Sequence, residues 1–240
     1  MDLLEERQTD FGMIRVQRRR DDGSFIYMQG TGIQSWSDRS GESLLRYVRA
    51  ACRMIEVRQP ANALVIGCAG GSLPTMLHRR GIAVTTVDVN PHAFDLATRF
   101  FHLPLDVECR VGDGHEFLAR DQRAWDVIML DAYDGEAMPG HFMAGGFVAD
   151  AVRRLAPDGW IMVNVVIETP DDPLADDIAQ LMRQCRLDVG IYGDAEIFEG
   201  NCLVVGAPMA GGNASLRRLD AALRVAAYPY RGRAVRDVIE

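Results

Sequence analysis

The sequence predicts an α/β fold in which helices cover both faces of a mainly parallel β-sheet. From residue 63 onward, short apolar runs alternate with segments whose apolar residues recur at helical spacing, which is the pattern of such a sheet. The first apolar run, 63–66, breaks into a glycine-rich turn, as happens where a strand leads directly into a helix. A chain of 240 residues, 48% of them hydrophobic, is long enough to bury one good-sized core. We therefore expect one main domain.

The chain before this region has a different pattern. Over 13–34, apolar residues alternate with polar ones on both sides of an Asp-Gly turn signal, which predicts a β-hairpin. Apolar residues at helical spacing over 42–57, followed by a proline, predict the first helix. These patterns divide the chain into an N-terminal β-hairpin region over 1–45 and an α/β domain over 46–240.

The α/β region is predicted element by element from its apolar runs and from the prolines and glycines that begin or end helices. Pro74 in a first turn and Gly81 as a stop mark one helix, and Pro91 opens the next. Helices are expected at 74–80, 93–101, 147–155 and 174–185. Strands are expected at 63–67, 84–89, 107–113, 126–131, 160–166, 187–192 and 201–207. Further leucines at helical spacing are Leu216, Leu219 and Leu223.

The glycine-rich turn has the residues of a nucleotide-cradling loop. A dinucleotide-binding turn needs glycine at its third and sixth positions, where this chain has Ala69 and Ser72. The G-x-G-x-G spacing of S-adenosyl-dependent enzymes fits better, because Gly67 and Gly71 match and Ala69 is still small. Asp88 follows 21 positions after Gly67, at the end of the next predicted strand, where a carboxylate accepts hydrogen bonds from both ribose hydroxyls. Together the two signals predict a nucleoside site.

Two further predicted strands also end in acidic residues. Because parallel strands present their carboxyl ends at one edge of a sheet, the loops after these strands should meet at one site. Asp113 and Gly114 suit the edge of an adenine ring, and Asp131 lies where a reacting group would be. Asp131 and Asp134, on one loop, can bind an ammonium ion, and a partly desolvated carboxylate can accept its proton. The alternative is structural: Asp134 belongs to a turn and Asp131 caps backbone amides.

Composition and charge argue against several classes of partner. The net charge of −8 and the pI near 5.2 do not give the basic surface that nucleic-acid binding needs. The longest apolar run, 160–167, is too short to span a bilayer. The acidic start lacks the basic and apolar parts of a signal peptide, so we expect a soluble, intracellular protein.

The cysteines and histidines show no metal-binding spacing. Five cysteines are scattered without a C-x-x-C pair, and no histidine lies at ligand spacing, so no metal is expected. Cys68 lies inside the glycine turn, where packing is its expected role. The five histidines, His115 and His141 among them, are expected to fill structural positions.

The order of these motifs over 32–160 resembles that of the spermidine synthase (polyamine aminopropyltransferase) family. The tripeptide ending at Gln34 resembles the family's G-x-Q, and Tyr47 lies where the family's first helix carries a tyrosine. The glycine turn, Asp88, the V-G-D-G segment and the D-A-Y-D loop followed by Pro139 stand in the family's order. The resemblance implies a Rossmann-like S-adenosylmethionine-dependent methyltransferase fold with a small N-terminal β-hairpin region. It also implies a cytoplasmic homodimer.

The resemblance further implies a reaction that needs no metal. Asp131 helps to deprotonate and orient a primary amine, which attacks the methylene next to the sulfonium of decarboxylated S-adenosylmethionine and releases methylthioadenosine. An alkylammonium ion has a pKa of about 10, so a carboxylate base serves the costly step. The implied catalytic residues are Asp131, Asp134 and Tyr47. The implied cofactor-binding residues are Gln34, Gly67, Ala69, Gly71, Asp88, Val89, Asp113, Gly114, Asp131 and Pro139.

Departures from the family pattern fall on the amine side of the site. The family's glycine loop carries an aspartate that grips the aminopropyl arm, and this chain has Gly70 there. The family's tyrosine is followed by a histidine, and this chain has Val48. Two alternatives therefore stand beside aminopropyl transfer: a methyltransferase that uses intact S-adenosylmethionine, and an inactive nucleoside-binding homologue. Retention of Asp131 and Asp134 counts against the inactive homologue.

Three aromatic residues are candidates for the wall of an apolar acceptor pocket: Trp36, Tyr133 and Phe142. Tyr133 lies between the two acids of the D-A-Y-D loop, which suits stacking beside the adenosine or the acceptor. Simple packing is the equal alternative for this residue.

Overall fold

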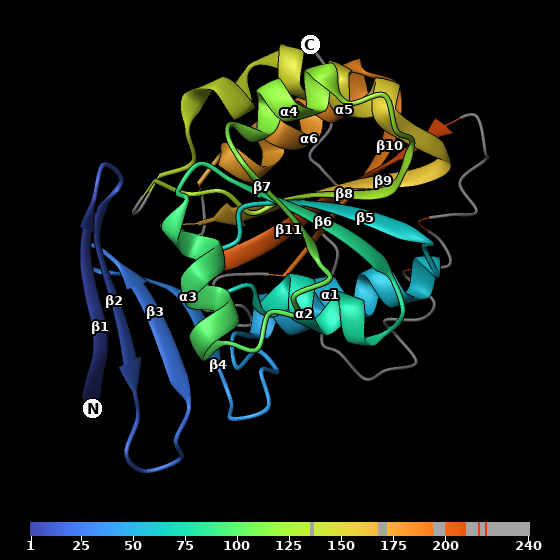
Figure 1. Ribbon diagram of the computed structural model, residues 1–240. Coiled ribbons are helices and arrows are strands. Elements are labelled where there is room, and N and C mark those ends of the chain that lie inside the picture. The colour runs from blue at the N-terminus through green and yellow to red at the C-terminus, as the bar shows by residue number, and fades with distance from the viewer. Residues whose placement is uncertain (135–136, 168–171, 194–199, 210–215, 217–218, 220–240) are drawn as a thin grey trace.

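The structure of the protein, a computed structural model, contains two β-sheets (Figure 1). It describes residues 1–134, 137–167, 172–193, 200–209, 216 and 219. The smaller sheet is antiparallel, with its four strands paired in chain order. We call it the N-terminal sheet, and its strands are β1 (Asp2–Thr9), β2 (Gly12–Arg18), β3 (Phe25–Gln29) and β4 (Gly32–Ser37).

The larger sheet has seven strands in the order β10-β11-β9-β8-β5-β6-β7. Five of them run parallel, and β11 pairs antiparallel with both β9 and β10 at one edge. This arrangement confirms the predicted α/β fold. The parallel strands are β5 (Asn62–Ile66), β6 (Ala83–Asp88), β7 (Glu108–Val111), β8 (Trp125–Leu130) and β9 (Leu155–Val166), and the remaining two strands are β10 (Leu187–Tyr192) and β11 (Asn201–Pro208).

Helices cover both faces of the larger sheet (Figure 1). One face packs against α1 (Arg46–Arg58), α2 (Ser72–Arg79) and α3 (His92–Phe100). The other face packs against α4 (Gly114–Arg120), α5 (Gly145–Arg154) and α6 (Leu174–Gln184), and a short 3-10 helix, η1 (Gly140–Met143), precedes α5. None of the helices described is long and apolar enough to cross a membrane.

The N-terminal region is larger than the predicted hairpin. The sequence prediction missed β1, because that strand carries charged residues such as Glu5, Glu6 and Arg7 rather than an apolar alternation. Backbone pairing with β2 and ion pairs hold it instead, including one between Arg15 and Glu6 at 2.7 Å.

The sequence predicts no helix over Gly114–Arg120, where α4 lies, and several helix boundaries differ from the prediction. The first helix begins at Arg46, because the backbone before it still pairs with the N-terminal sheet: the Leu44 amide donates to the Trp36 carbonyl at 2.7 Å. Leu155 begins β9 and does not belong to α5. Leu216 and Leu219 are helical and buried, whereas Leu223 lies outside the described residues.

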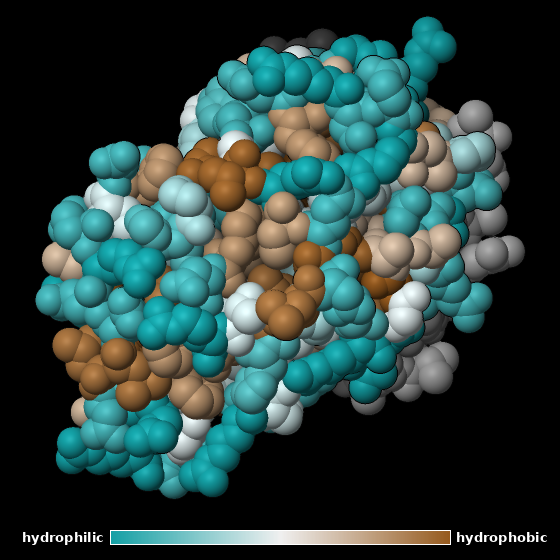
Figure 2. All heavy atoms as spheres, in the orientation of Figure 1, coloured by the Kyte–Doolittle hydropathy of each residue, from teal (hydrophilic) through white to brown (hydrophobic). Residues whose placement is uncertain are grey.

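Phe101 joins the N-terminal sheet to the larger one. Its ring, fully buried just after α3, lies 6.1 Å from the ring of Phe25 and 6.2 Å from that of Tyr27. Ile14 and Val16 of β2 complete this apolar cluster. Figure 2 shows apolar side chains gathered between the N-terminal sheet and the rest of the molecule, on a face that is otherwise mainly hydrophilic. The cluster fixes the N-terminal sheet beside the carboxyl ends of β5 and β6.

Replacing Phe101 by alanine should therefore destabilise the whole molecule. We expect Phe101→Ala to lower the free energy of unfolding by about 3–5 kcal/mol, because it removes a buried ring and leaves a cavity. Urea unfolding followed by circular dichroism measures this. The control is Leu105→Ala, close in sequence but 90% exposed, which should leave the free energy of unfolding unchanged. Equal free energies of unfolding for the two variants would show that packing at Phe101 does not stabilise the fold as proposed.

Candidate active site

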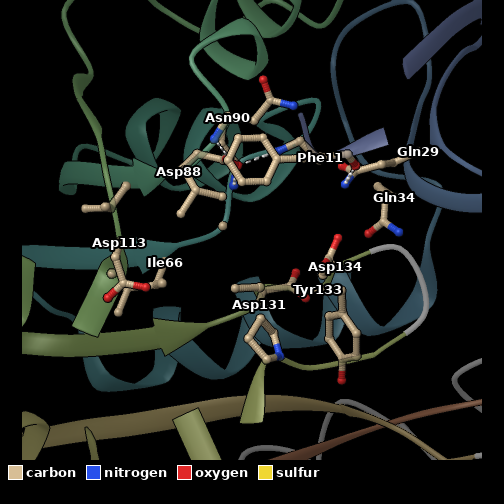
Figure 3. A pocket seen from close by; sticks show the side chains of 18 of the residues that line it. Phe11, Gln29, Gln34, Ile66, Asp88, Asn90, Asp113, Asp131, Tyr133 and Asp134 are labelled. Carbon is tan, nitrogen blue, oxygen red and sulfur yellow. Dashed lines mark hydrogen bonds between the residues drawn. The ribbon is translucent and has the colours of Figure 1, made fainter. Parts of the chain in front are cut away.

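A cavity opens at the carboxyl ends of β5, β6, β7 and β8, beside the N-terminal sheet (Figure 3). The four loops that the sequence predicts to meet at one site all contribute to it. We call it the main cavity. Its lining includes most of the predicted nucleoside-binding residues, namely Gln34, Gly67, Ala69, Asp88, Val89, Asp113, Gly114, Asp131 and Pro139.

The glycine turn brings the loop after β8 against the end of β5. Gly67 has a φ of +98°, and a Cβ atom on it would lie 2.0 Å from the carbonyl oxygen of Asp131. Only glycine permits this approach. Gly71 also has a positive φ, of +67°, at the start of α2, where it packs against Ala97 and Leu103 and does not line the main cavity. The contact between Gly71 and a ligand stays a prediction.

Asp88 is bonded to the glycine turn. Its Oδ2 accepts hydrogen bonds from the backbone amides of Cys68 at 2.8 Å and Ala69 at 3.3 Å, and its Oδ1 accepts one from the amide of Asn90 at 2.8 Å. Burial raises the pKa of Asp88 above its ordinary value, and the three amides, which favour the charged form, oppose this shift. The carboxylate thus shapes the turn as well as facing the main cavity, a function that the sequence did not indicate.

Two side chains from different elements, Asn164 of β9 and Tyr47 of α1, hydrogen-bond to the carboxylate of Asp131. Its Oδ1 accepts a hydrogen bond from Asn164 Nδ2 at 2.8 Å, and its Oδ2 accepts one from the Tyr47 hydroxyl at 3.3 Å. Burial raises the pKa of Asp131 above its ordinary value, and the two hydrogen bonds oppose the shift. The sequence prediction missed Asn164. The available signal was a polar residue inside the apolar run that forms β9, where Asn164 is 1% exposed.

Tyr133 and Asp134 differ in where their side chains lie. The Tyr133 hydroxyl donates to the carbonyl of Asn164 at 3.0 Å and accepts from the amide of Val166 at 2.8 Å. Figure 3 shows its ring pointing away from Asp88, and its two hydrogen bonds anchor the loop to β9. Tyr133 also lines the main cavity, so its stacking beside a ligand stays a prediction. Asp134 is exposed at the rim, and its amide donates to the carbonyl of Ala137.

Asp113 already has two partners at the far end of the main cavity. Its Oδ1 caps α4 by accepting from the amide of Glu116 at 2.8 Å, and its Oδ2 pairs with His141 Nε2 at 2.9 Å. His141 itself lines the main cavity, which corrects the structural position expected for it. His115 lies outside, pairs with Asp150 at 2.9 Å and stacks parallel to His141 with ring centroids 6.3 Å apart. A ligand at this end meets the imidazole of His141 together with Asp113.

The N-terminal sheet forms one wall of the main cavity. Besides the predicted Gln34, it contributes Phe11, Tyr27 and Gln29. The side-chain amide of Gln29 donates to the carbonyl of Phe11 at 2.7 Å, which fixes the β1–β2 turn (Figure 3). Of the three aromatic residues expected in the wall of an acceptor pocket, Tyr133 and Phe142 line the main cavity. Trp36 does not: its indole N–H donates to Ser24 Oγ at 2.9 Å, and Arg19 lies over its ring.

A second, smaller cavity of about 30 Å³ lies between β4, α1 and the glycine turn. We call it the side cavity. Tyr47 lines the side cavity but not the main cavity. Its hydroxyl donates to Asp131, which lines both. The residues that both cavities share are Gln34, Gly67, Cys68, Ala69 and Asp131.

The N-terminal sheet fills the space around Gly70. A Cβ atom on Gly70 would lie 2.8 Å from Ser35 Cβ and 3.0 Å from Cδ1 of Phe101. The amide of Gly70 donates to Ser35 Oγ at 3.0 Å. A larger side chain at this position therefore requires its neighbours to move.

The described residues hold no group of three histidine, cysteine, aspartate or glutamate side chains placed to bind a metal ion. The described groups that can exchange a proton at the junction of the two cavities include the carboxylate of Asp131. Asp131 lies where the two cavities join, with its pKa raised, which is the condition for a carboxylate that accepts a proton.

Asp88 should be required for any adenosine ligand. We expect Asp88→Ala to weaken the binding of methylthioadenosine and S-adenosylhomocysteine by about tenfold or more, because hydrogen bonds to a charged group contribute about 1.5–3 kcal/mol. Isothermal titration calorimetry measures both affinities. The control is Asp95→Ala, which removes a half-exposed carboxylate on α3 outside the cavity. Unchanged affinities in a folded Asp88→Ala variant would rule out its assigned contact with the ribose.

Comparison with known proteins finds relatives in two groups of transferases, and no family model matches the chain. The polyamine aminopropyltransferase of Vibrio vulnificus is 29% identical over 113 residues, which are 44% of this chain and 38% of that protein. The N-terminal histidine N-methyltransferase of Emericella nidulans is 30% identical over 125 residues, which are 50% of this chain and 22% of that protein. The chain thus spans well under two thirds of the length of either relative.

Solved structures share the fold over most of the chain. A probable spermidine synthase from Corynebacterium glutamicum superposes with a TM-score of 0.77 at 16% identity, covering 96% of this chain and 89% of the other. Human methyltransferase-like protein 13 superposes with a TM-score of 0.62 at 20% identity, covering 81% of this chain and 97% of the other. In sequence this chain is similar to polyamine aminopropyltransferases, and in fold it is similar to spermidine synthases.

Proposed function

We propose that this protein transfers an aminopropyl group from decarboxylated S-adenosylmethionine to an amine acceptor. The observation that carries the proposal is the position of Asp131, a carboxylate with a raised pKa where the main and side cavities join. Similarity to polyamine aminopropyltransferases supports the reaction class. The proposal treats the donor as a substrate of the main cavity and assigns no metal to the site.

The proposed place of the donor follows from the lining of the main cavity. Asp88 accepts from the ribose hydroxyls, and Asp113 with His141 meets the adenine edge. The closely packed glycine turn fits this group, because it leaves backbone rather than side chain facing the ligand at Gly67. Further contacts are assigned to Gln34, Ala69, Val89, Gly114 and Pro139, and Gly71 supports them by shaping the turn.

In the proposed reaction Asp131 acts as the base. An alkylammonium acceptor binds its ionised carboxylate and gives up a proton to it, and Tyr47 and Asn164 hold the carboxylate in place. The free amine nitrogen then forms a bond to the methylene beside the sulfonium, and the carbon–sulfur bond breaks. Methylthioadenosine leaves as a neutral thioether, so no general acid is needed. We assign Asp134, at the exposed rim, to attraction of the cationic acceptor.

A methyltransferase is the second candidate, favoured by one observation. The glycine turn has no acidic side chain at position 70, and the packing of Ser35 and Phe101 closes that space. A donor that keeps its carboxylate meets no repulsion there. Similarity to methyltransferases in sequence and fold fits this candidate too.

Localisation, assembly and domain roles are also part of the proposal. We propose a cytoplasmic homodimer, as the resemblance to spermidine synthases implies, in which residues 46–240 form the transferase domain and 1–45 complete its substrate wall. The small-molecule acceptor is the partner proposed for the site. The acidic net charge of −8 suits attraction of a cationic acceptor.

Asp131→Asn separates catalysis from donor binding. We expect this variant to lower kcat by about 10²–10⁴-fold, the usual contribution of a general base, with methylthioadenosine affinity nearly unchanged. Methylthioadenosine release from the decarboxylated donor, with a panel of primary amines, measures turnover, and calorimetry measures affinity. Release of S-adenosylhomocysteine from intact S-adenosylmethionine, measured separately with the same amines, would favour the second candidate. Full turnover by the variant would remove Asp131 from the mechanism.

Tyr47→Phe should shift the pH dependence. The wild-type rate falls as pH decreases through the pKa of Asp131, which lies above its ordinary 3.8, because the protonated carboxyl cannot accept a proton. The Tyr47 hydrogen bond favours the ionised form, so its removal raises this pKa and moves the acidic limb of kcat/KM to higher pH. Profiles of both proteins over the same pH range test this. An acidic limb that stays in place or moves to lower pH would contradict it.

A further inference from the structure

Tyr27 of β3 carries a buried hydroxyl at the wall of the main cavity. Its ring packs in the apolar cluster beside Phe101, with ring centroids 6.2 Å apart, and the residue is 1% exposed. The same residue lines the main cavity. Among the residues that the structure describes, none forms a hydrogen bond with the Tyr27 hydroxyl.

The unpaired hydroxyl is open toward the main cavity. In the described part of the chain, the side-chain atoms that are both fully enclosed and unpaired are Thr75 Oγ1, Thr86 Oγ1 and Asn164 Oδ1. The Tyr27 oxygen is not one of them, so the small exposed part of this residue includes its hydroxyl, at the cavity that it lines. Buried polar groups in proteins are normally hydrogen-bonded. An unpaired one at a cavity wall therefore indicates a partner that the ligand supplies.

Asp88 determines which partner suits this hydroxyl. Burial raises the pKa of Tyr27, and the negative charge of Asp88 acts in the same direction, so the hydroxyl keeps its proton. Tyr27 can therefore donate a hydrogen bond, whereas an ionised carboxylate such as that of Asp88 can only accept. A sugar hydroxyl that donates to a carboxylate still has lone pairs that accept from another group. Tyr27 and Asp88 are thus complementary partners for the hydroxyls of a ribose.

Two side-chain amides on the same wall already donate within the protein. Gln29 Nε2 donates to the carbonyl of Phe11 at 2.7 Å, and Asn90 Nδ2 donates to Thr9 Oγ1 at 3.4 Å (Figure 3). The Tyr27 hydroxyl differs from both, because its proton has no acceptor among the described residues.

We infer that Tyr27 is a further nucleoside-binding residue, whose hydroxyl donates to a ribose hydroxyl of the ligand beside Asp88. This inference rests on the proposed function and adds a specificity-determining contact to the same site. A nucleoside that lacks this sugar hydroxyl leaves the buried tyrosine hydroxyl unpaired, so the site discriminates against it. The N-terminal sheet thereby takes part in recognising the nucleoside as well as in enclosing it.

Tyr27→Phe removes the hydroxyl and keeps the packed ring. We expect this variant to bind methylthioadenosine and adenosine about three- to tenfold more weakly, the usual effect of one hydrogen bond, by isothermal titration calorimetry. Its urea unfolding midpoint without ligand should stay the same or rise, because the lost hydroxyl has no partner among the described residues. A lower midpoint with unchanged affinities would show a structural role and overturn the inference.

Tyr192→Phe is the matched control. Tyr192, on β10, is 3% exposed and does not line the main cavity, so this variant should keep the wild-type affinity for both ligands. Equal losses of affinity in the two variants would overturn the inference, because the effect would not depend on the cavity.

Deoxynucleosides identify the atom that Tyr27 contacts. Wild type and Tyr27→Phe are titrated with adenosine, 2′-deoxyadenosine and 3′-deoxyadenosine. We expect the variant to lose affinity for adenosine but to bind at least one deoxy analogue within about twofold of wild type, because that contact is already absent. An equal loss for all three ligands, or a loss for none, overturns the inference and leaves the adenosine site standing. If wild type binds neither methylthioadenosine nor adenosine, the proposed function fails as well.

Discussion

The close approach of Gly67 to the backbone of Asp131 determines the geometry of the site. The amide of Asp131 donates to the carbonyl of Ile66 at 2.8 Å, and the amide of Gly67 donates to the carbonyl of Val87 at the same distance. These bonds join the ends of three neighbouring strands, and the missing Cβ of Gly67 allows the contact. These backbone contacts place Asp131 between the two cavities, and the side-chain hydrogen bonds add to them.

The N-terminal sheet acts as the other half of the site. It contributes Phe11, Tyr27, Gln29 and Gln34 to the main cavity, and its last strand bonds to the glycine turn through Ser35 and to α2 through Ser37. The proposed donor and acceptor surfaces therefore depend on the packing at Phe101, which lies against Gly70 of the glycine turn. Stability and substrate binding share one apolar cluster in this protein.

Much of the architecture was predictable from the sequence, because strands and helices of an α/β sheet leave strong local patterns. The apolar run before Gly67 and the acid at Asp88 mark strand ends, and parallel strands must present these ends together. Strand β1 was not predictable in this way, since its charged residues are stabilised by pairing with β2 and not by an apolar face.

Side-chain contacts across long sequence separations could not be predicted. Asn164 reaches Asp131 from a neighbouring strand, and His141 reaches Asp113 from the loop before α5. The position of Tyr133 depends on two backbone groups of β9, which no local sequence pattern indicates. The sequence specified which loops meet, whereas the partners of each polar group follow from tertiary packing.

The packing around Gly70 restricts which residues this position of the glycine turn can hold. Ser35 and Phe101 occupy the space that a side chain at position 70 needs, and Phe101 also anchors the N-terminal sheet. An aspartate placed at position 70 alone would meet both residues and strain the packing that supports the fold. An acidic residue in this glycine turn therefore requires accompanying substitutions on separate elements. The composition of the turn is thus coupled to the attachment of the N-terminal sheet.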